Sequence, residues 1–290
     1  MACMDFGQIY AALMPLSPSS DFTIIGVPFD GLVSCRKGAA LAPSRIRHWS
    51  KQITPFSEDR ISLKLLNVAD SGDIIINNPL NDFRIIEQKI AGINNIPIIL
   101  GGDHSITIPV IKSLKEKYKN KKLGLLWLDA HPDLCNEFNG SKLSHACVLR
   151  RALDYGINEE DVCMVGIRSW EEQEVDFIKN SRLNLFTAME IADKGMKIVC
   201  EEITKILSKC DAVYISFDID ALDSTIAPGT GIPDCGGISM REALTLIKSL
   251  RNLPLVGLDV VEVAPNLDIS ESTVFAALKI IMEFIALKAK

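Results

Sequence analysis

The sequence predicts an α/β fold built on a mostly parallel sheet of about eight strands. Three observations lead to this fold class. Apolar, β-branched runs recur along the 290 residues, segments with helical spacing separate most of them, and several runs lack polar alternation. Strands without alternation are typical of a parallel sheet that helices cover on both faces. Because no linker, repeat or shift in composition divides the chain, we expect a single domain over residues 1–290.

The strands are predicted from short runs rich in Val, Ile, Leu and aromatic residues, such as FTIIGVPF near the start and LVGLDVVEV near the end. Spacing alone does not predict their order in the sheet. In chain order they are expected at 22–29, 61–68, 96–100, 122–128, 162–167, 183–186, 212–217 and 255–263.

The helices are predicted where apolar residues recur three and four positions apart. The first is DFRIIEQKIAGI, the next is SITIPVIKSLKEKY, and the last runs to the final residue. A further short helix is expected around His48 in SRIRHWS. The longer ones are expected at 82–93, 105–118, 196–210, 240–252 and 271–290.

Composition narrows the class of protein. A formal net charge of -6 and an isoelectric point near 5.4 argue against a nucleic-acid partner, which would need a clustered basic surface. The first twenty residues contain no Lys or Arg, and no apolar run is long enough to span a bilayer. The eight cysteines form no CxxC pair, which favours free thiols in a reducing compartment. We therefore expect a soluble, cytoplasmic protein without a membrane partner.

Polar clusters follow four of the predicted strands. The run IPIIL leads into GGDHS, KLGLLWL into DAHPD and AVYISF into DID, while Glu262 lies near the end of the last strand. In open parallel sheets, ligands bind beyond the carboxyl ends of the strands. These residues are therefore expected to share one site.

The DAHPD segment places Asp129, His131 and Asp133 at every second position, so their side chains can converge if the chain stays extended. Asp218 and Asp220 repeat this spacing. Several carboxylates held close together need cations to stay ionised. Two divalent ions would satisfy them, and with His104 and His131 the donor set suits Mn²⁺, with Co²⁺, Ni²⁺ or Fe²⁺ as alternatives.

A single Asp after a strand is more often a turn or helix cap, and for Asp103 and Asp223 this interpretation, or contact with a metal ligand instead of the metal, is favoured. A paired metal site can present hydroxide to an electrophile, so hydrolysis is the expected chemistry. Glu262 in an apolar strand needs a partner, which could be a guanidinium substrate or an Arg of the protein. His145, in a loop, suits proton transfer to a leaving amine.

These motifs together resemble those of the ureohydrolases, the arginase and agmatinase family. The resemblance extends from GVPFD through GGDHS, DAHPD, the SHxxxxRRA loop and GIRS to SFDIDALD, APGTGIP and DVVEVAP. It implies a three-layer α/β/α sandwich that assembles as a trimer or hexamer. It also implies two Mn²⁺ ions bridged by Asp129 and Asp218, a catalytic set of His145, Asp220 and Glu262, substrate binding by Glu262 and His145, and six metal ligands: His104, Asp129, His131, Asp133, Asp218 and Asp220.

The reaction implied by the resemblance is attack of hydroxide on the guanidino carbon, with release of urea and an amine. Arginases typically carry Ile-Asn after DAHxD, whereas Leu134-Cys135 stands here, so recognition of an amino-acid end is not expected. Together with GVPFD, GIRS and EVAP, this favours agmatine as substrate, giving putrescine and urea as in polyamine biosynthesis.

Three departures from the family pattern keep alternatives open: Ala146, Ser224 and Ile232. Ile232 replaces a hydroxyl near the substrate, which can shift specificity strongly. The alternatives are an arginase, a guanidino-acid hydrolase, a formiminoglutamate hydrolase, or a catalytically weakened relative that acts as a scaffold or binding protein. A dinuclear phosphatase is disfavoured because Glu262 would repel phosphate.

Overall fold

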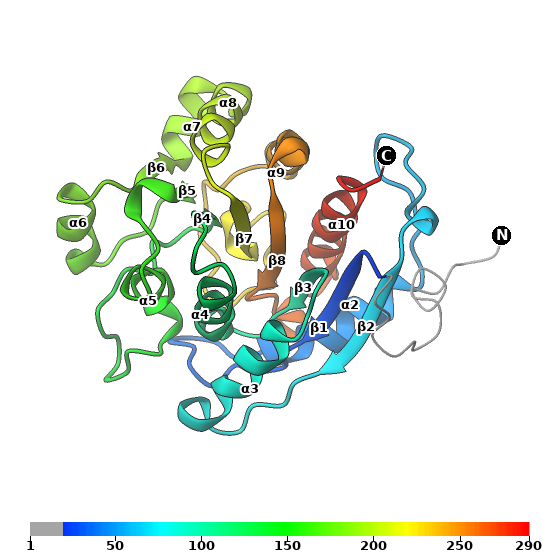
Figure 1. Cartoon of the computed structure of the whole chain (residues 1–290), viewed down its shortest axis with the longest axis horizontal. Helices are drawn as coiled ribbons and strands as arrows, with labels where there is room; N and C mark the ends of the chain where they lie inside the picture. Colours follow the sequence, from blue (N-terminus) through cyan, green and yellow to red (C-terminus); the bar gives the residue numbers. More distant parts are fainter. Residues whose placement is uncertain (1–19, 290) are drawn as a thin grey trace.

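The computed structural model describes residues 20–289 and contains one sheet of eight parallel strands (Figure 1). The order across the sheet is β2-β1-β3-β8-β7-β4-β5-β6, so the predicted α/β class with a parallel sheet is confirmed. The strands are β1 (Phe22–Gly26), β2 (Val68–Asp73), β3 (Ile96–Leu100), β4 (Leu123–Leu128), β5 (Val162–Ile167), β6 (Asn184–Thr187), β7 (Ala212–Asp218) and β8 (Leu255–Val261).

Helices cover both faces of the sheet and form two outer layers (Figure 1). One layer contains α3 (Pro79–Ala91), α4 (Thr107–Lys117), α5 (Val148–Asp154) and α6 (Glu172–Lys179). The other contains α2 (Ala42–Ser50), α7 (Ala188–Lys194), α8 (Met196–Leu207), α9 (Met240–Ser249) and α10 (Ser272–Ala286).

Each inner strand contributes alternate side chains to the two cores. Ile24 packs in one hydrophobic cluster and Ile25 in the other, and Leu126 and Trp127 divide in the same way. Both faces of a strand are therefore buried, which explains the runs without polar alternation. The result is the three-layer sandwich that the family resemblance implied.

The strand predicted at 61–68 is wrong. A short 3-10 turn occupies Leu63–Leu65, and Leu65 is 77% exposed, so this apolar run does not pair with the sheet. The strand begins only at Val68 and continues through polar residues. They are tolerated because β2 is an edge strand and exposure increases towards its C-terminal end. Arg47 of α2 binds two of those residues, Asp70 at 2.7 Å and Asp73 at 2.6 Å.

Other predictions differ mainly at the ends of elements. The first strand stops at Gly26. The last strand stops at Val261, because Glu262 turns the chain with a positive φ of 60°. The short helices α5, α6 and α7 were not predicted. No helix within residues 20–289 has the length and apolar character needed to cross a bilayer. Two predictions concern residues outside those described: the absence of a signal peptide, and the domain limits at residues 1 and 290.

The sheet order brings the polar clusters together. Strands β3, β8, β7 and β4 are consecutive neighbours in the middle of the sheet, and all run parallel. These are the four strands after which GGDHS, Glu262, DID and DAHPD occur. Their carboxyl ends therefore meet at one edge, as the sequence predicted.

Candidate metal centre and substrate pocket

The segment after β3 lies very close to the backbone of the loop after β1. A Cβ on Gly102 would lie 1.7 Å from the carbonyl oxygen of Phe29, so only glycine fits there. The Gly102 carbonyl accepts a hydrogen bond from the Glu262 N–H at 2.9 Å. Asp103 Oδ1 then caps the next turn by accepting from the Ser105 N–H at 3.0 Å, as expected for a capping residue. This turn places the His104 ring among Asp129, Asp133 and Asp218.

The segments after β4 and β7 are held by their own carboxylates. Asp129 Oδ1 accepts from the His131 N–H at 2.7 Å, and Asp218 Oδ1 accepts from the Asp220 N–H at 2.9 Å. Asp220 Oδ1 accepts from the Ala130 N–H at 3.0 Å, which joins the two segments. In each of these carboxylates the other oxygen, Oδ2, lies 3.2 Å from an imidazole nitrogen.

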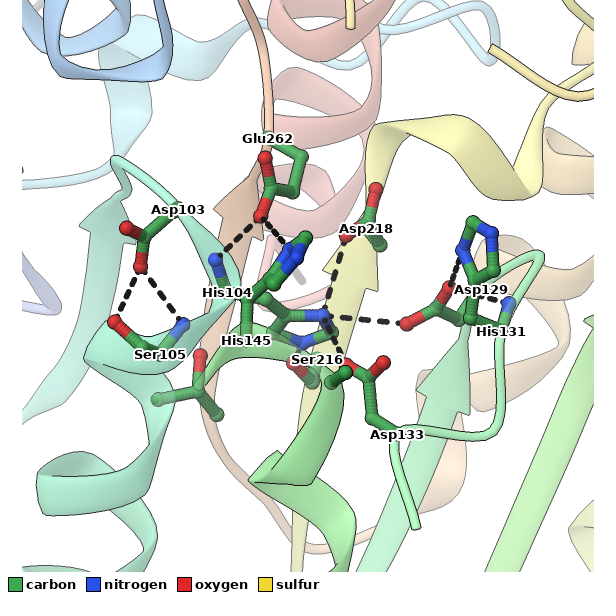
Figure 2. Close-up of polar contacts among 12 residues, drawn as sticks. Asp103, His104, Ser105, Asp129, His131, Asp133, His145, Ser216, Asp218 and Glu262 are labelled. Carbon is green, nitrogen blue, oxygen red and sulfur yellow. Dashed lines mark hydrogen bonds and ion pairs between the residues drawn. The ribbon is translucent and has the colours of Figure 1, made fainter. Parts of the chain in front are cut away.

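Three carboxylate oxygens surround one imidazole nitrogen (Figure 2). His104 Nδ1 lies 3.2 Å from Oδ2 of each of three aspartates, Asp129, Asp133 and Asp218. A single N–H cannot donate to three acceptors, and both Nδ1 and Asp129 Oδ2 are buried without a hydrogen-bond partner among the described residues. Separations of this size are typical of ligands that share one cation, so the donor set fits a divalent metal.

A second cluster adjoins the first. His131 Nδ1 lies 3.4 Å from Asp129 Oδ1 and 3.2 Å from Asp220 Oδ2. Asp129 therefore offers one oxygen to each cluster, and the two groups that could hold a metal ion share this residue. The structure brings together all six residues that the sequence singled out as candidate ligands.

The electrostatics show what these groups do without a cation. Burial, and then repulsion from Asp220 and Asp129, raise the pKa of Asp218 well above its usual value. Burial, and then repulsion from Asp129, raise the pKa of Asp133 to about 7. Burial opposes protonation of His104, but its contacts with the aspartates outweigh it and raise its pKa. Protons thus neutralise the cluster in part, and bound metal ions would displace them.

The other side of the His104 ring is fixed by residues that sequence analysis missed. His104 Nε2 lies 2.8 Å from Ser216 Oγ, which in turn donates to Asp259 Oδ1 at 2.8 Å. The ring stacks on Trp127 with centroids 4.3 Å apart. Ser216 and Asp259 are polar residues inside the apolar runs AVYISF and LVGLDVV, and that signal could have found them.

Glu262 lies above the two clusters of His and Asp side chains and pairs with His145 (Figure 2). Its Oε1 accepts from the His104 N–H at 2.8 Å and lies 3.1 Å from His145 Nδ1. Within residues 20–289 no Arg or Lys forms an ion pair with Glu262, so the alternative of an internal Arg partner is not observed. Its positive φ turns the carboxylate out of the strand and towards the pocket.

His145 is held between Glu262 and the loop after β1. Its Nε2 lies 2.9 Å from Ser34 Oγ and accepts from the Ser34 N–H at 3.0 Å. Burial opposes protonation of His145, but the hydrogen bond and charge of Glu262 outweigh it and raise its pKa to about 9. The Glu262 carboxylate thus favours a proton on the imidazole; in the protonated form Nε2 would donate to Ser34 Oγ instead of accepting from the Ser34 N–H.

The pocket has a volume of about 200 Å³. Phe138, Trp170 and Ile232 contribute apolar walls, Glu171 and Glu174 contribute carboxyl groups, and no Lys or Arg among the described residues lines it. Ala146 also borders the pocket.

Several residues that the sequence did not assign to the metal site lie outside the pocket. Asp223 holds a turn by accepting from the Gly236 N–H at 2.7 Å, and His48 packs on Trp49. Cys135 and Cys147 are buried and are not among the residues that line the pocket. The cysteines of the described chain are free thiols: Cys35, Cys135, Cys147, Cys163, Cys200, Cys210 and Cys235.

Comparison with known proteins agrees with this geometry. The family model described as "Arginase family" matches residues 20–286, and the chain therefore belongs to the arginase family. Guanidinobutyrase of Pseudomonas aeruginosa is 34% identical over 275 residues, which cover 91% of this chain and 85% of that protein. Agmatinase of Bacillus subtilis is 35% identical over 290 residues, with 96% of each chain covered.

A solved structure supports the fold as well. Proclavaminate amidino hydrolase from Streptomyces clavuligerus superposes with a TM-score of 0.87 at 30% identity, covering 94% of this chain and 93% of that one. The ureohydrolase resemblance and the arginase-like fold are thus confirmed. As a member of this family, the protein is a hydrolase that acts on guanidino C–N bonds, and its His and Asp clusters could hold the metal centre that the family binds.

Proposed function

We propose that the protein hydrolyses agmatine to putrescine and urea with two Mn²⁺ ions bound. One observation carries the proposal: two adjacent donor clusters share Asp129 and open on the same pocket as the Glu262 carboxylate. The oxygen-rich donors with two imidazoles suit Mn²⁺. When bound, the two ions would lower the pKa of water and supply hydroxide for attack on the guanidino carbon.

The proposed ligands follow from the distances. One ion would be held by His104, Asp129, Asp133 and Asp218, which face each other across the first cluster. The other would be held by His131, Asp129 and Asp220, and the family resemblance adds Asp218 as its fourth ligand. Asp220 also belongs to the proposed catalytic set, together with His145 and Glu262.

The remaining steps depend on the chain's own residues. Glu262 binds the guanidinium group, because a carboxylate oxygen accepts a strong, charge-assisted hydrogen bond from a guanidinium N–H. His145 lies beside that carboxylate, which raises the pKa of the imidazole, so His145 can take up a proton and give it to the leaving amine. The apolar walls exclude water from the amine's carbon chain.

The charge of the pocket favours agmatine over substrates with an acidic end. No cation among the described lining residues could pair with a substrate carboxylate, whereas the carboxylate of Glu171 can attract an amine. Trp170 adds an aromatic face that suits a cation. A guanidino acid is the second candidate, because the similarity to guanidinobutyrase is as strong as that to agmatinase.

The test is a substrate panel with the Mn²⁺-loaded protein. We expect urea release with the highest kcat/KM for agmatine, compared with arginine, 4-guanidinobutyrate and formiminoglutamate. A higher kcat/KM for 4-guanidinobutyrate would establish the second candidate, and formamide from formiminoglutamate would indicate that related activity. Absence of every product, with metal bound, would favour the scaffold alternative.

Two further proposals concern assembly and location. From the family resemblance we propose that the chain assembles as a homo-oligomer, a trimer or hexamer, and from its composition that it acts in the cytoplasm. Sedimentation velocity would test the assembly: a monomer at micromolar concentration would contradict it.

A further inference from the structure

Thr230 carries a buried hydroxyl with no protein partner. The residue is 1% exposed and borders the pocket, and Oγ1 makes no hydrogen bond to any part of the described chain. A buried hydroxyl without a partner is costly, and such groups are rare in folded proteins. Its position therefore indicates that a ligand completes its hydrogen bonding.

The backbone around Thr230 is held firmly. Arg36 donates from Nη2 to the Thr230 carbonyl at 3.0 Å and from Nε to the Gly231 carbonyl at 2.9 Å. Thr230 also pairs with Val263 through an antiparallel bridge, and the Ala264 N–H donates to the Gly229 carbonyl at 2.7 Å. The segment therefore cannot shift readily to find another partner for the hydroxyl.

The same segment passes beside the free oxygen of Glu262. A Cβ on Gly231 would lie 3.7 Å from Glu262 Oε2. Oε1 is already engaged by the His104 N–H and by His145, whereas no hydrogen bond joins Oε2 to another residue of the described chain (Figure 2). Glu262 Oε2 and Thr230 Oγ1 are thus two unused acceptors of residues that line the same pocket.

We propose that Thr230 is a substrate-binding residue whose Oγ1 accepts a hydrogen bond from a guanidinium N–H while Glu262 Oε2 accepts another. A guanidinium offers several N–H donors in one plane and no acceptor, so a wall with two acceptors complements it. The inference rests on the proposed function, because it takes the substrate to be a guanidino compound.

The matched variants are Thr230→Val, which keeps the shape but removes the hydroxyl, and Thr230→Ser, which keeps the hydroxyl. For agmatine we expect Thr230→Val to lower kcat/KM by about tenfold or more, the size typical of a lost bond to a charged donor. Thr230→Ser should stay within about threefold of the unchanged protein. The Tm and metal content of Thr230→Val should not fall, because the hydroxyl bonds to no protein group.

Two results would overturn the inference: kcat/KM of Thr230→Val equal to that of the unchanged protein, or a fall in Tm or metal content that accompanies the loss of activity. Calorimetric titration of agmatine into both Mn²⁺-loaded proteins separates this question from the reaction itself. If the unchanged protein releases no urea, the proposed function fails, yet about tenfold weaker agmatine binding by Thr230→Val would still support the role of Thr230. Equal binding, or no binding by either protein, would contradict it.

Discussion

Replacing Asp259 by Asn should weaken metal binding, although Asp259 reaches the proposed ligand His104 only through Ser216. Asp259 is fully buried and accepts from three hydroxyls: Tyr214 at 2.7 Å and Thr107 at 2.9 Å on Oδ2, and Ser216 at 2.8 Å on Oδ1. An ionised carboxylate only accepts, so Ser216 donates its hydrogen to it and accepts from the Nε2–H of His104. The Nδ1 lone pair of His104 is then free to face a cation.

The Asn variant reverses this chain of hydrogen bonds. Its carbonyl oxygen would keep the two hydroxyls on one side, and its amide group would donate to Ser216. Ser216 must then donate to His104 Nε2, which leaves the proton on Nδ1, where a cation would bind. Returning the His104 proton to Nε2 means breaking one or two neutral hydrogen bonds, which costs about 1.4 to 2.7 kcal/mol. We therefore expect about 10- to 100-fold weaker Mn²⁺ binding.

The assay is calorimetric titration of Mn²⁺ into the metal-free proteins, and nitrogen-15 chemical shifts of the His104 ring would report its tautomer directly. Tyr214→Phe is the matched control, because it removes one donor to Asp259 without altering the bond to Ser216. Its Mn²⁺ affinity should change by less than about threefold. Equal affinities for Asp259→Asn and the unchanged protein, or an equal loss in Tyr214→Phe, would refute the reasoning.

Three other predictions concern the same centre. Removing divalent ions with a chelator should lower the Tm by about 9 °C relative to ions at 100 times their Kd, since each of the two ions adds about 2.7 kcal/mol; an unchanged Tm in differential scanning calorimetry would show that no ion stabilises the fold. Asp129→Asn should reduce kcat more than about 100-fold and weaken both metal sites, because its carboxylate faces both clusters; near-normal urea release would contradict the shared role. In the metal-free protein the pKa of His145 should be about 9 by NMR, and Glu262→Gln should lower it, because the Glu262 charge stabilises the imidazolium. Since the folded-state pKa is raised, the stability from this pair is present below about 6.5 and is lost as the pH rises through about 9; a pKa unchanged by Glu262→Gln would reject the coupling.

The central strands could be predicted because their burial on both faces leaves a strong mark in the sequence. The runs at 96–100 and 162–167 coincide with β3 and β5. The edge strand β2 could not be found in the same way, since half of it meets solvent and its sequence, VADSGD, is mostly polar. The strand order depends on pairings between distant segments, which spacing does not encode.

The candidate metal site was predictable for a different reason. The carboxyl ends of adjacent parallel strands lie at one edge, and β3, β8, β7 and β4 prove to be neighbours. What sequence could not supply was the choice of partner for each polar group. Glu262 could have paired with an Arg, and only coordinates place it against His145 and His104. The same holds for Asp259 and for the unpartnered hydroxyl of Thr230.

Diffraction from crystals grown with Mn²⁺, measured with X-rays at the manganese absorption edge, would test the central proposal most directly. The account predicts two anomalous peaks per chain, one enclosed by His104, Asp129, Asp133 and Asp218 and the other by His131, Asp129, Asp218 and Asp220. No peak, or peaks away from these side chains, would contradict it.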